Sequence, residues 1–303
     1  MLSYLHGYHA GNAADVLKHS ALVFCLEYLK RKAKPLLCVD THAGAGLYDF
    51  SDTSNRNGEW EKGVGKLLAA FGAFQGRDLS PQSVSDRLPP MIAGYLKTAV
   101  DFRDSHVRYS GSPAIMAKLL TDGDRLVSYE LHPGEFETLN ASMAELRRGS
   151  RGAGRATLEV RKEDGTEGLK SLLPPPSRRA LVFIDPSWED KNEFETIPAF
   201  AAEGLRRFPE GTFIVWYPLL ASPKKKDAPV SVQDMLFNLK ETKCCLAELC
   251  TGKAETSPRG MYGSGIVIYN PPWTLKSAFE EALPFLAKFL GGGKGDWRLK
   301  WRG

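Results

Sequence analysis

The sequence has no apolar run of the about 18 residues that a membrane-spanning helix needs, and its start, Met1–His6, lacks the basic and apolar blocks of a signal peptide. Cysteine is scarce: the five thiols are odd in number, and no two have the CxxC spacing. These absences argue against a disulfide framework and a structural zinc site, and the missing His/Cys pattern removes the zinc deaminases as a class. We therefore expect a soluble, cytoplasmic protein without a bound metal or a membrane partner.

The charge balance is only mildly basic. The chain has 40 basic and 36 acidic side chains, a formal net charge of +4, which is compatible with a nucleic-acid partner without requiring one. Each basic cluster alone is typical of a solvated surface, but together they favour contact with phosphates. The clusters are Arg31/Lys32/Lys34, Arg147/Arg148/Arg151, Arg178/Arg179, Arg206/Arg207, Lys224/Lys225/Lys226 and Arg298/Lys300/Arg302.

Short apolar runs that end in polar or glycine-rich turns alternate with helical patterns. The runs are Leu36–Asp40, Leu126–Glu130, Ala156–Arg161, Ala180–Asp185, Thr212–Tyr217, and a hairpin-like pair at Cys244–Leu249 and Gly265–Asn270. This alternation predicts a parallel, doubly wound α/β sheet, in which ligands bind beyond the carboxyl ends of the strands. The glycine-rich segment Leu290–Gly295 predicts a loose tail.

One segment interrupts the alternation between the first and second runs. We expect residues 1–50 and 109–303 to form a Rossmann-like domain and residues 51–108 to form an inserted helical subdomain. Helical stretches at Val64–Phe74 and Met91–Arg103 support this interpretation, and they flank a polar, proline-rich middle. The insertion is a candidate for substrate contact, although a purely decorative insertion fits the sequence equally well.

Polar residues after the first three runs fit a nucleoside cofactor. Gly44 and Gly46 follow the first run and allow close approach of the backbone to a ligand, but the pattern is not the G-x-G-x-x-G of NAD enzymes. Glu130 follows the second run, where a carboxylate usually holds ribose hydroxyls, and Asp164-Gly165 follows the third, facing the adenine edge. This ordered set predicts S-adenosylmethionine as the cofactor. A small-molecule methyltransferase or an NAD enzyme remains a competing hypothesis.

The fourth run ends in Asp185-Pro186-Ser187-Trp188, close to the Asp/Asn-Pro-Pro-aromatic tetrapeptide of amino methyltransferases. The lone pair of an aryl amine is delocalised into the ring, so catalysis needs acceptors that pull the nitrogen toward tetrahedral geometry. The Asp185 carboxylate and the Pro186 carbonyl can be those acceptors, and Trp188 can stack on a flipped base. We therefore predict catalytic roles for Asp185, Pro186 and Trp188, with Trp188 also binding substrate.

A second tetrapeptide, Asn270-Pro271-Pro272-Trp273, fits the pattern better. It follows what looks like the last strand, which we expect at the edge of the sheet and therefore away from a cofactor held by the first three strands. We interpret it as a strand terminator.

Motifs along nearly the whole chain carry a resemblance to a known family. In order they are Met1-Leu2-Ser3-Tyr4, His9–His19, Asp40–Gly46, Gly111-Ser112-Pro113, Glu130-Leu131-His132-Pro133, Asp164-Gly165, Trp216-Tyr217-Pro218, Arg259-Gly260-Met261 and Gly263-Ser264-Gly265. With these motifs the chain resembles the bacterial RlmJ-type 23S ribosomal RNA adenine-N6 methyltransferases.

The resemblance implies the site as well as the activity. The implied cofactor contacts are His19, His42, Ser112, Glu130, Asp164 and Asp185, with Lys18 nearby. Tyr4 is implied near the substrate adenine and Asp185 as the catalytic acceptor. A monomer acting on large-subunit ribosomal RNA, either naked or in an assembly intermediate, is the implied form of the enzyme.

The chain departs from the family pattern at two positions, because Ser187 replaces a second proline and Trp188 replaces the usual tyrosine. Losing a proline can loosen the loop that aims the Pro186 carbonyl. The alternative hypothesis is therefore a nucleic-acid-binding protein with weak or lost methyltransferase activity. A role in the use of external DNA, which the resemblance also carries, would fit that alternative.

Overall fold

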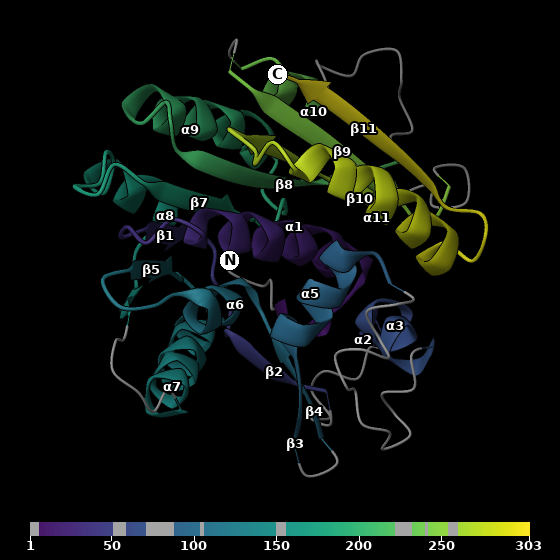
Figure 1. The fold of residues 1–303 in the computed structure, drawn as a ribbon, viewed down its shortest axis with the longest axis horizontal. Coiled ribbons are helices and arrows are strands. Elements are labelled where there is room, and N and C mark those ends of the chain that lie inside the picture. The colour runs from purple at the N-terminus through teal and green to yellow at the C-terminus, as the bar shows by residue number, and fades with distance from the viewer. Residues whose placement is uncertain are drawn as a thin grey trace.

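The computed structural model describes residues 6–50, 59–70, 88–103, 106–149, 156–221, 232–239, 242–253 and 260–303. In this part of the chain eight strands form one twisted sheet in the order β11-β9-β10-β8-β7-β1-β5-β6 (Figure 1). Its strands are β1 Leu37–Asp40, β5 Arg125–Tyr129, β6 Thr157–Arg161, β7 Ala180–Ile184, β8 Thr212–Leu220, β9 Cys244–Cys250, β10 Met261–Tyr269 and β11 Asp296–Arg302.

The sheet is parallel in one half and antiparallel in the other. Strands β6, β5, β1, β7 and β8 run parallel to one another, whereas β10 pairs antiparallel with β8 and β9, and β9 pairs antiparallel with β11. The central strands β1 and β7 are buried at every position, which explains why they read as continuous apolar runs rather than alternating ones. The predicted doubly wound, mostly parallel α/β fold is confirmed.

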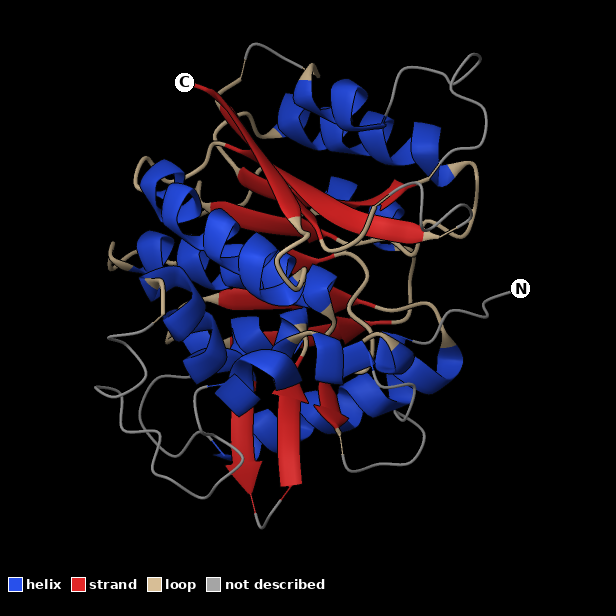
Figure 2. Cartoon of the chain, turned by 90° about the vertical axis from the view of Figure 1, so that its right-hand side faces the viewer, coloured by secondary structure: helices blue, strands red, loops and turns tan. Residues whose placement is uncertain are grey.

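Helices pack in two groups that cover the sheet (Figure 2). One group comprises α1 Ala13–Lys30, α5 Pro90–Ala99, α6 Ser112–Leu119, α7 Pro133–Gly149 and α11 Leu275–Leu290. The other comprises the short α8 Gly165–Gly168 and η4 Leu169–Ser171, with α9 Glu193–Arg207 and α10 Val232–Phe237. A short 3-10 turn, η1 His6–Tyr8, precedes α1. Within the described residues, no helix is long and apolar enough to span a membrane, and no group of side chains could hold a metal ion.

The segment between β1 and β5 contains strands as well as helices. Helices α2 Glu59–Lys62 and α3 Val64–Ala70 come first, and α5 packs against α1. Strands β2 Leu47–Asp49, β4 His106–Ser110 and β3 Val100–Arg103 form a second, three-stranded sheet that projects away from the main one (Figure 1). The domain boundaries at residues 51 and 108 stay a prediction.

Several local predictions needed correction. The second helical stretch is shorter than expected, because α5 ends at Ala99 and the chain continues into β3. The prediction of a loose tail was also wrong: after α11 ends, Gly291–Gly295 turns the chain into β11, which closes the edge of the sheet beside β9. The proline-rich middle of the insertion before Leu88 and the basic cluster Lys224/Lys225/Lys226 lie outside the described residues.

The second tetrapeptide lies away from the residues that follow the first three parallel strands, as expected, but the reason given for that position was wrong. Strand β10 is not at the edge of the sheet but lies between β9 and β8. Because β10 runs antiparallel to β8, with Tyr269 opposite Phe213, its carboxyl end lies where β8 begins. Asn270 is therefore at the opposite end of the sheet from the residues that follow β1, β5, β6 and β7. The interpretation as a strand terminator is consistent with this position.

A polar connection crosses the antiparallel half of the sheet. Tyr217, Gly265, Glu248 and Arg298 are register partners on β8, β10, β9 and β11. The Tyr217 ring passes over Gly265, where an added Cβ would lie 2.3 Å from the ring, and its hydroxyl donates to Glu248 Oε1 at 2.8 Å. Arg298 completes the row with two hydrogen bonds of 2.6 Å to the Glu248 carboxylate.

Candidate active site

The glycine-rich turn after β1 lies beside the acid that follows β5. The backbone N–H of Gly44 donates to Glu130 Oε2 at 2.8 Å, and the N–H of His132 donates to Oε1 at 2.8 Å. Gly44 and Gly46 both have positive φ angles, 61° and 82°, a conformation that favours glycine. The Glu130 carboxylate is thus fixed by two backbone donors at the carboxyl ends of β1 and β5.

Asp164 and Gly165 bring the end of β6 to the same place. Asp164 caps α8 by accepting hydrogen bonds from the Thr166 N–H at 2.7 Å and hydroxyl at 2.6 Å. Partial burial alone would raise the pKa of Asp164, but these hydrogen bonds hold it below its usual value. An added Cβ at Gly165 would lie 2.3 Å from the Thr41 carbonyl oxygen, so this position admits no side chain.

Asp40, the last residue of β1, is fully buried beneath this turn. Burial raises its pKa to about 7, and nearby Asp185 and Glu130 act in the same direction, while hydrogen bonds from the Ser112 hydroxyl and the His42 N–H oppose the rise. Its Oδ2 atom has no hydrogen-bond partner among the described residues. A buried carboxylate oxygen without a partner is costly, and a cationic or hydrogen-bond-donating ligand would relieve that cost.

His42 is oriented by its neighbour. The Thr41 hydroxyl donates to the Phe183 carbonyl at 3.1 Å and lies 2.8 Å from His42 Nδ1. Because the hydroxyl has only one proton and gives it to the carbonyl, it must accept from Nδ1–H. Burial lowers the pKa of His42, with Asp185, Glu130 and Asp164 opposing, so the ring is neutral with its lone pair on Nε2.

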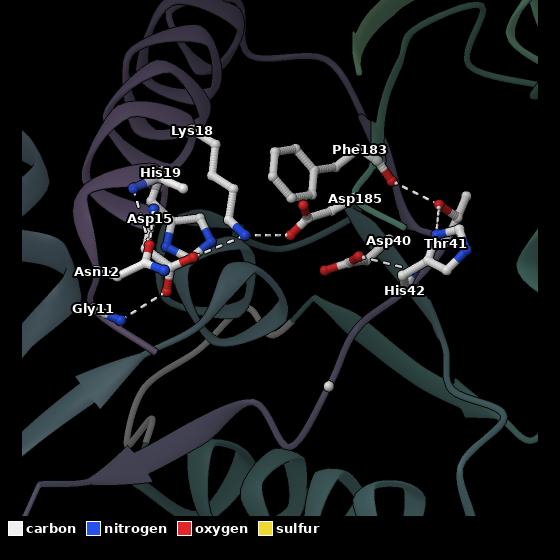
Figure 3. Close-up of polar contacts among 12 residues, drawn as sticks. Gly11, Asn12, Asp15, Lys18, His19, Asp40, Thr41, His42, Phe183 and Asp185 are labelled. Carbon is white, nitrogen blue, oxygen red and sulfur yellow. Dashed lines mark hydrogen bonds and ion pairs between the residues drawn. The ribbon is translucent and has the colours of Figure 1, made fainter. Parts of the chain in front are cut away.

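Asp185 follows β7 and is held by a lysine from the first helix. Lys18 Nζ lies 2.7 Å from Asp185 Oδ2 and 2.8 Å from Asp15 Oδ1, and all three side chains are almost completely buried (Figure 3). The ammonium also faces the ring of Trp216 at 5.1 Å from its centroid. Since Ile184 pairs with Val215 on β8, the next residues, Asp185 just after β7 and Trp216 within β8, lie side by side. Removing one partner of such a buried pair leaves an uncompensated charge.

These groups surround a cavity of about 650 Å³ at the carboxyl ends of the parallel strands. Of the residues predicted from the sequence, the lining includes His42, Gly44, Ser112, Glu130, Asp164, Gly165 and Asp185. The lining also contains the carboxylates of Glu135, Glu163, Glu189, Asp190 and Glu193, and among the described lining residues there is no lysine or arginine. The site is therefore strongly acidic.

Other predicted residues lie outside this lining. Lys18 and His19 are buried behind it, at 3% and 1% exposure. Trp188, in a left-handed conformation with φ 57°, is 7% exposed and packs its ring on Phe194 at 5.0 Å rather than facing the cavity. Stacking of Trp188 on a base stays a prediction, and it requires the ring to leave Phe194. Pro186 is buried next to Asp185, and Tyr4 lies outside the described residues.

Sequence reasoning missed Asp15 and Trp216. Asn12 caps α1 through its side chain, and the Asp15 carboxylate accepts a hydrogen bond from the Gly11 N–H at 2.8 Å, so the Asn-x-x-Asp spacing predicts a helix start. That spacing gives no sign that the same carboxylate also holds Lys18. Trp216 belongs to a recognised motif, but only the pairing of β7 with β8 places it beside Asp185.

The fold is the Rossmann-like fold of class I methyltransferases, a mostly parallel sheet with helices on both faces. Comparison with known proteins agrees with this class. The family model for "Ribosomal RNA large subunit methyltransferase D, RlmJ" matches residues 33–303. Ribosomal RNA large subunit methyltransferase J of Haemophilus influenzae is 36% identical, and that of Escherichia coli is 35% identical, each over 99% of both chains.

The chain therefore belongs to the RlmJ family of ribosomal RNA large subunit methyltransferases. A crystal structure of a protein from Legionella pneumophila is similar in fold, with a TM-score of 0.78 and 29% identity, over 97% of this chain and 99% of that one.

Proposed function

We propose that this protein transfers a methyl group from S-adenosylmethionine to the N6 amine of an adenine in 23S ribosomal RNA. The observation that carries the proposal is the Asp185 carboxylate at the end of β7, lining the same cavity as Gly44, Glu130 and Asp164. The names of the relatives supply the RNA class, since both act on large-subunit ribosomal RNA. We further propose a cytoplasmic monomer that acts on naked RNA or on an assembly intermediate.

The residues present fit the cofactor. A cavity of about 650 Å³ is within the range of small-molecule sites. Glu130, fixed by two backbone donors, suits two vicinal ribose hydroxyls, and Asp164 suits an exocyclic amine. The unpartnered Oδ2 of Asp40 and the acidic lining suit a ligand with cationic groups. When bound, the cofactor supplies an electrophilic methyl group on a sulfonium.

The reaction needs acceptors for the amine protons. Asp185 offers a carboxylate and Pro186 a backbone carbonyl, two acceptors that can orient the nitrogen lone pair toward the incoming methyl group. Lys18 contacts Oδ2 of Asp185 at 2.7 Å, which leaves Oδ1 as an acceptor for the amine. After transfer, the nitrogen loses a proton, and the Asp185 carboxylate is the base within reach.

The proposal is tested with purified protein, labelled S-adenosylmethionine and unmodified large-subunit RNA. We expect methyl label on adenine N6, and we expect Asp185→Ala to lower the transfer rate by about 10²–10⁴-fold. Glu280→Ala, on the exposed side of α11, is the matched control and should retain the wild-type rate. Full activity of Asp185→Ala would refute the assigned role, and label on another atom would refute the substrate.

The competing function is RNA or DNA binding without turnover, and Ser187 in the cavity lining is the observation that favours it. That hypothesis predicts salt-dependent binding and no label transfer, even after Ser187→Pro restores the second proline. Transfer by the wild-type protein excludes it.

A further inference from the structure

The buried lysine beside Asp185 contacts a second carboxylate as well. Lys18 Nζ lies 2.7 Å from Asp185 Oδ2 and 2.8 Å from Asp15 Oδ1 (Figure 3). The side chains of Lys18, Asp185 and Asp15 are only 4%, 8% and 1% exposed, so one positive charge faces two negative charges with little water to screen them. An excess buried charge is costly, and Lys18 alone is enough to neutralise Asp185. The second carboxylate therefore needs an explanation of its own.

The start of α1 fixes Asp15 through one of its two oxygens. Asp15 Oδ2 accepts a hydrogen bond from the Gly11 N–H at 2.8 Å, and the Asp15 N–H donates to Asn12 Oδ1 at 3.0 Å. Gly11 has a φ of 78°, and an added Cβ there would lie 2.7 Å from the Phe50 ring, so this turn requires glycine. The other oxygen, Oδ1, points to Lys18, which lies three residues further along α1 on the same face of the helix.

A second buried pair on the same helix shows that a structural role needs only one carboxylate. At the other end of α1, Lys30 forms an ion pair with Asp124, which is 1% exposed and accepts hydrogen bonds from backbone N–H groups of the loops around it. Among the described residues, Asp124 is the single acidic partner of Lys30. Asp124 directly precedes β5, at the opposite end of the sheet from the cavity. Two carboxylates on one lysine are therefore a feature of the cavity end of α1.

The second carboxylate affects where the ammonium lies on Asp185. A carboxylate has lone pairs on both oxygens, and an ammonium with a single carboxylate partner is attracted to both of them. Asp15 attracts the same ammonium toward α1, and Lys18 contacts Asp185 at Oδ2. Oδ1 is the oxygen that the proposed reaction uses to accept from the amine. Its availability therefore depends on how Lys18 is held.

We propose that Asp15 is a positioning residue for methyl transfer: it holds Lys18 on Oδ2 of Asp185 and so keeps Oδ1 open to the amine of the target base. This inference rests on the proposed function for the reaction that Asp185 serves. Asp15 is 1% exposed and acts through Lys18 rather than by touching the substrate.

The first measurements need no ligand. In wild-type protein labelled with nitrogen-15 and carbon-13, we expect scalar couplings across hydrogen bonds from Lys18 Nζ to the carboxylate carbons of both Asp15 and Asp185. A crystal structure of Asp15→Asn should show the ammonium within hydrogen-bond distance of both Asp185 oxygens. Coupling to only one carboxylate, or an ammonium that stays on Oδ2 in the variant, would overturn the proposal. Asp15→Ser, whose hydroxyl can still accept from the Gly11 N–H, is the second variant if Asp15→Asn does not fold.

The second measurement separates positioning from a merely structural role. With unmodified large-subunit RNA and labelled S-adenosylmethionine, Asp15→Asn should lower the single-turnover transfer rate by about ten- to a hundredfold, the range for a hydrogen bond to a charged group. Its affinity for S-adenosylhomocysteine in calorimetry should stay within about twofold of the wild type, because Glu130 and Asp164 are untouched.

Two outcomes of that measurement count against the proposal: an unchanged rate, or a parallel loss of rate and affinity. If the wild type transfers no label, the proposed function fails, whereas the position of Lys18 in Asp15→Asn still tests the role of Asp15.

Asp124→Asn is the matched control. It also removes the charge of a buried aspartate that pairs with a lysine of α1, but at the end of the sheet away from the cavity. Urea unfolding should show a loss of stability in both variants, whereas the transfer rate of Asp124→Asn should equal that of the wild type. An equal loss of rate in the two variants would show that the rate follows general loosening and would overturn the proposal.

Discussion

The two tetrapeptides, Asp185–Trp188 after β7 and Asn270–Trp273 after β10, are similar in sequence but differ in their surroundings. The Asp185 carboxylate enters an acidic cavity and is paired with a buried lysine. The Asn270 amide is used within the fold, donating to the carbonyls of Pro209 and Gly211 at 2.7 Å each. The two tryptophans also differ in burial, because Trp188 is 7% exposed and Trp273 is 76% exposed.

The difference shows that the direction of a strand, more than the motif, decides what a strand-ending tetrapeptide can do. Strand β7 delivers its residues to the end of the sheet that holds Gly44 and Glu130. Strand β10 runs the other way and delivers Asn270 to the start of β8, where the Thr212 hydroxyl donates to its carbonyl at 3.2 Å. The segment Asn270–Trp273 matches the tetrapeptide pattern better, yet its position makes it the end of a strand.

The largest contrast in stability should come from the two tryptophans. Trp188→Ala removes a buried ring packed on Phe194 and should cost about 3–5 kcal/mol, whereas Trp273→Ala should change stability by less than about 0.5 kcal/mol. Urea unfolding measures both. A small cost for Trp188→Ala would indicate that its ring spends much of its time away from Phe194.

Asn270→Ala should be the next largest effect. It removes two hydrogen bonds to backbone carbonyls and places alanine at a φ of 50°, which together should cost about 2–3 kcal/mol. Asn270→Gly keeps the conformation without strain and should cost less, isolating the hydrogen bonds. Methyl transfer by the folded fraction should be unchanged in both variants. Lost activity would contradict the assignment of Asn270 to a purely structural role.

The most gradual expected effect is a pH dependence at the end of the sheet that holds Asp185, because it is spread over several pH units. Because the pKa of Asp40 is about 7 in the folded protein, the folded state retains a proton that the unfolded chain releases near pH 4. The stability contributed by this group is present at low pH and is lost as pH rises toward 7, by up to about 1.4 kcal/mol per unit. Unfolding measured between about pH 5 and about pH 8 should show a flatter profile in Asp40→Asn. Parallel profiles for the two proteins would contradict this prediction.

A bound cationic ligand should lower the pKa of Asp40, whereas burial raises it. Because a cation favours the ionised carboxylate, the affinity for S-adenosylmethionine should rise with pH through about 7, and Asp40→Asn should abolish that rise.

Periodicity and turn residues were enough to predict the seven strands found from the sequence, because buried parallel strands are continuous apolar runs. Strand β11 was missed because its alternation of Trp297, Arg298, Leu299 and Lys300 sits behind a glycine run that suggested a tail. The small sheet was missed because β2 and β3 have only three and four residues.

The candidate site also contains residues that the sequence indicates and contacts that only the fold brings about. Glu130 and Asp185 could be proposed from the sequence because each follows a strand directly, and Asp164 because it lies in the turn just after β6. Contacts such as Lys18 with Asp185, or His19 with Tyr109, join residues on different elements, and no spacing in the sequence reveals them. The resemblance named Lys18 and His19 but not what holds them.

The row from Tyr217 to Arg298 has a consequence for local opening. The hydroxyl of the central strand and the guanidinium of the edge strand share one carboxylate, so β11 cannot detach without leaving Glu248, which is 5% exposed, with an unpaired charge. Slow hydrogen exchange should therefore extend to the amides that β11 shares with β9, as one cooperative unit with β8. Gly265 makes that unit possible, because any side chain there would push the Tyr217 ring aside and let the edge strand fray independently.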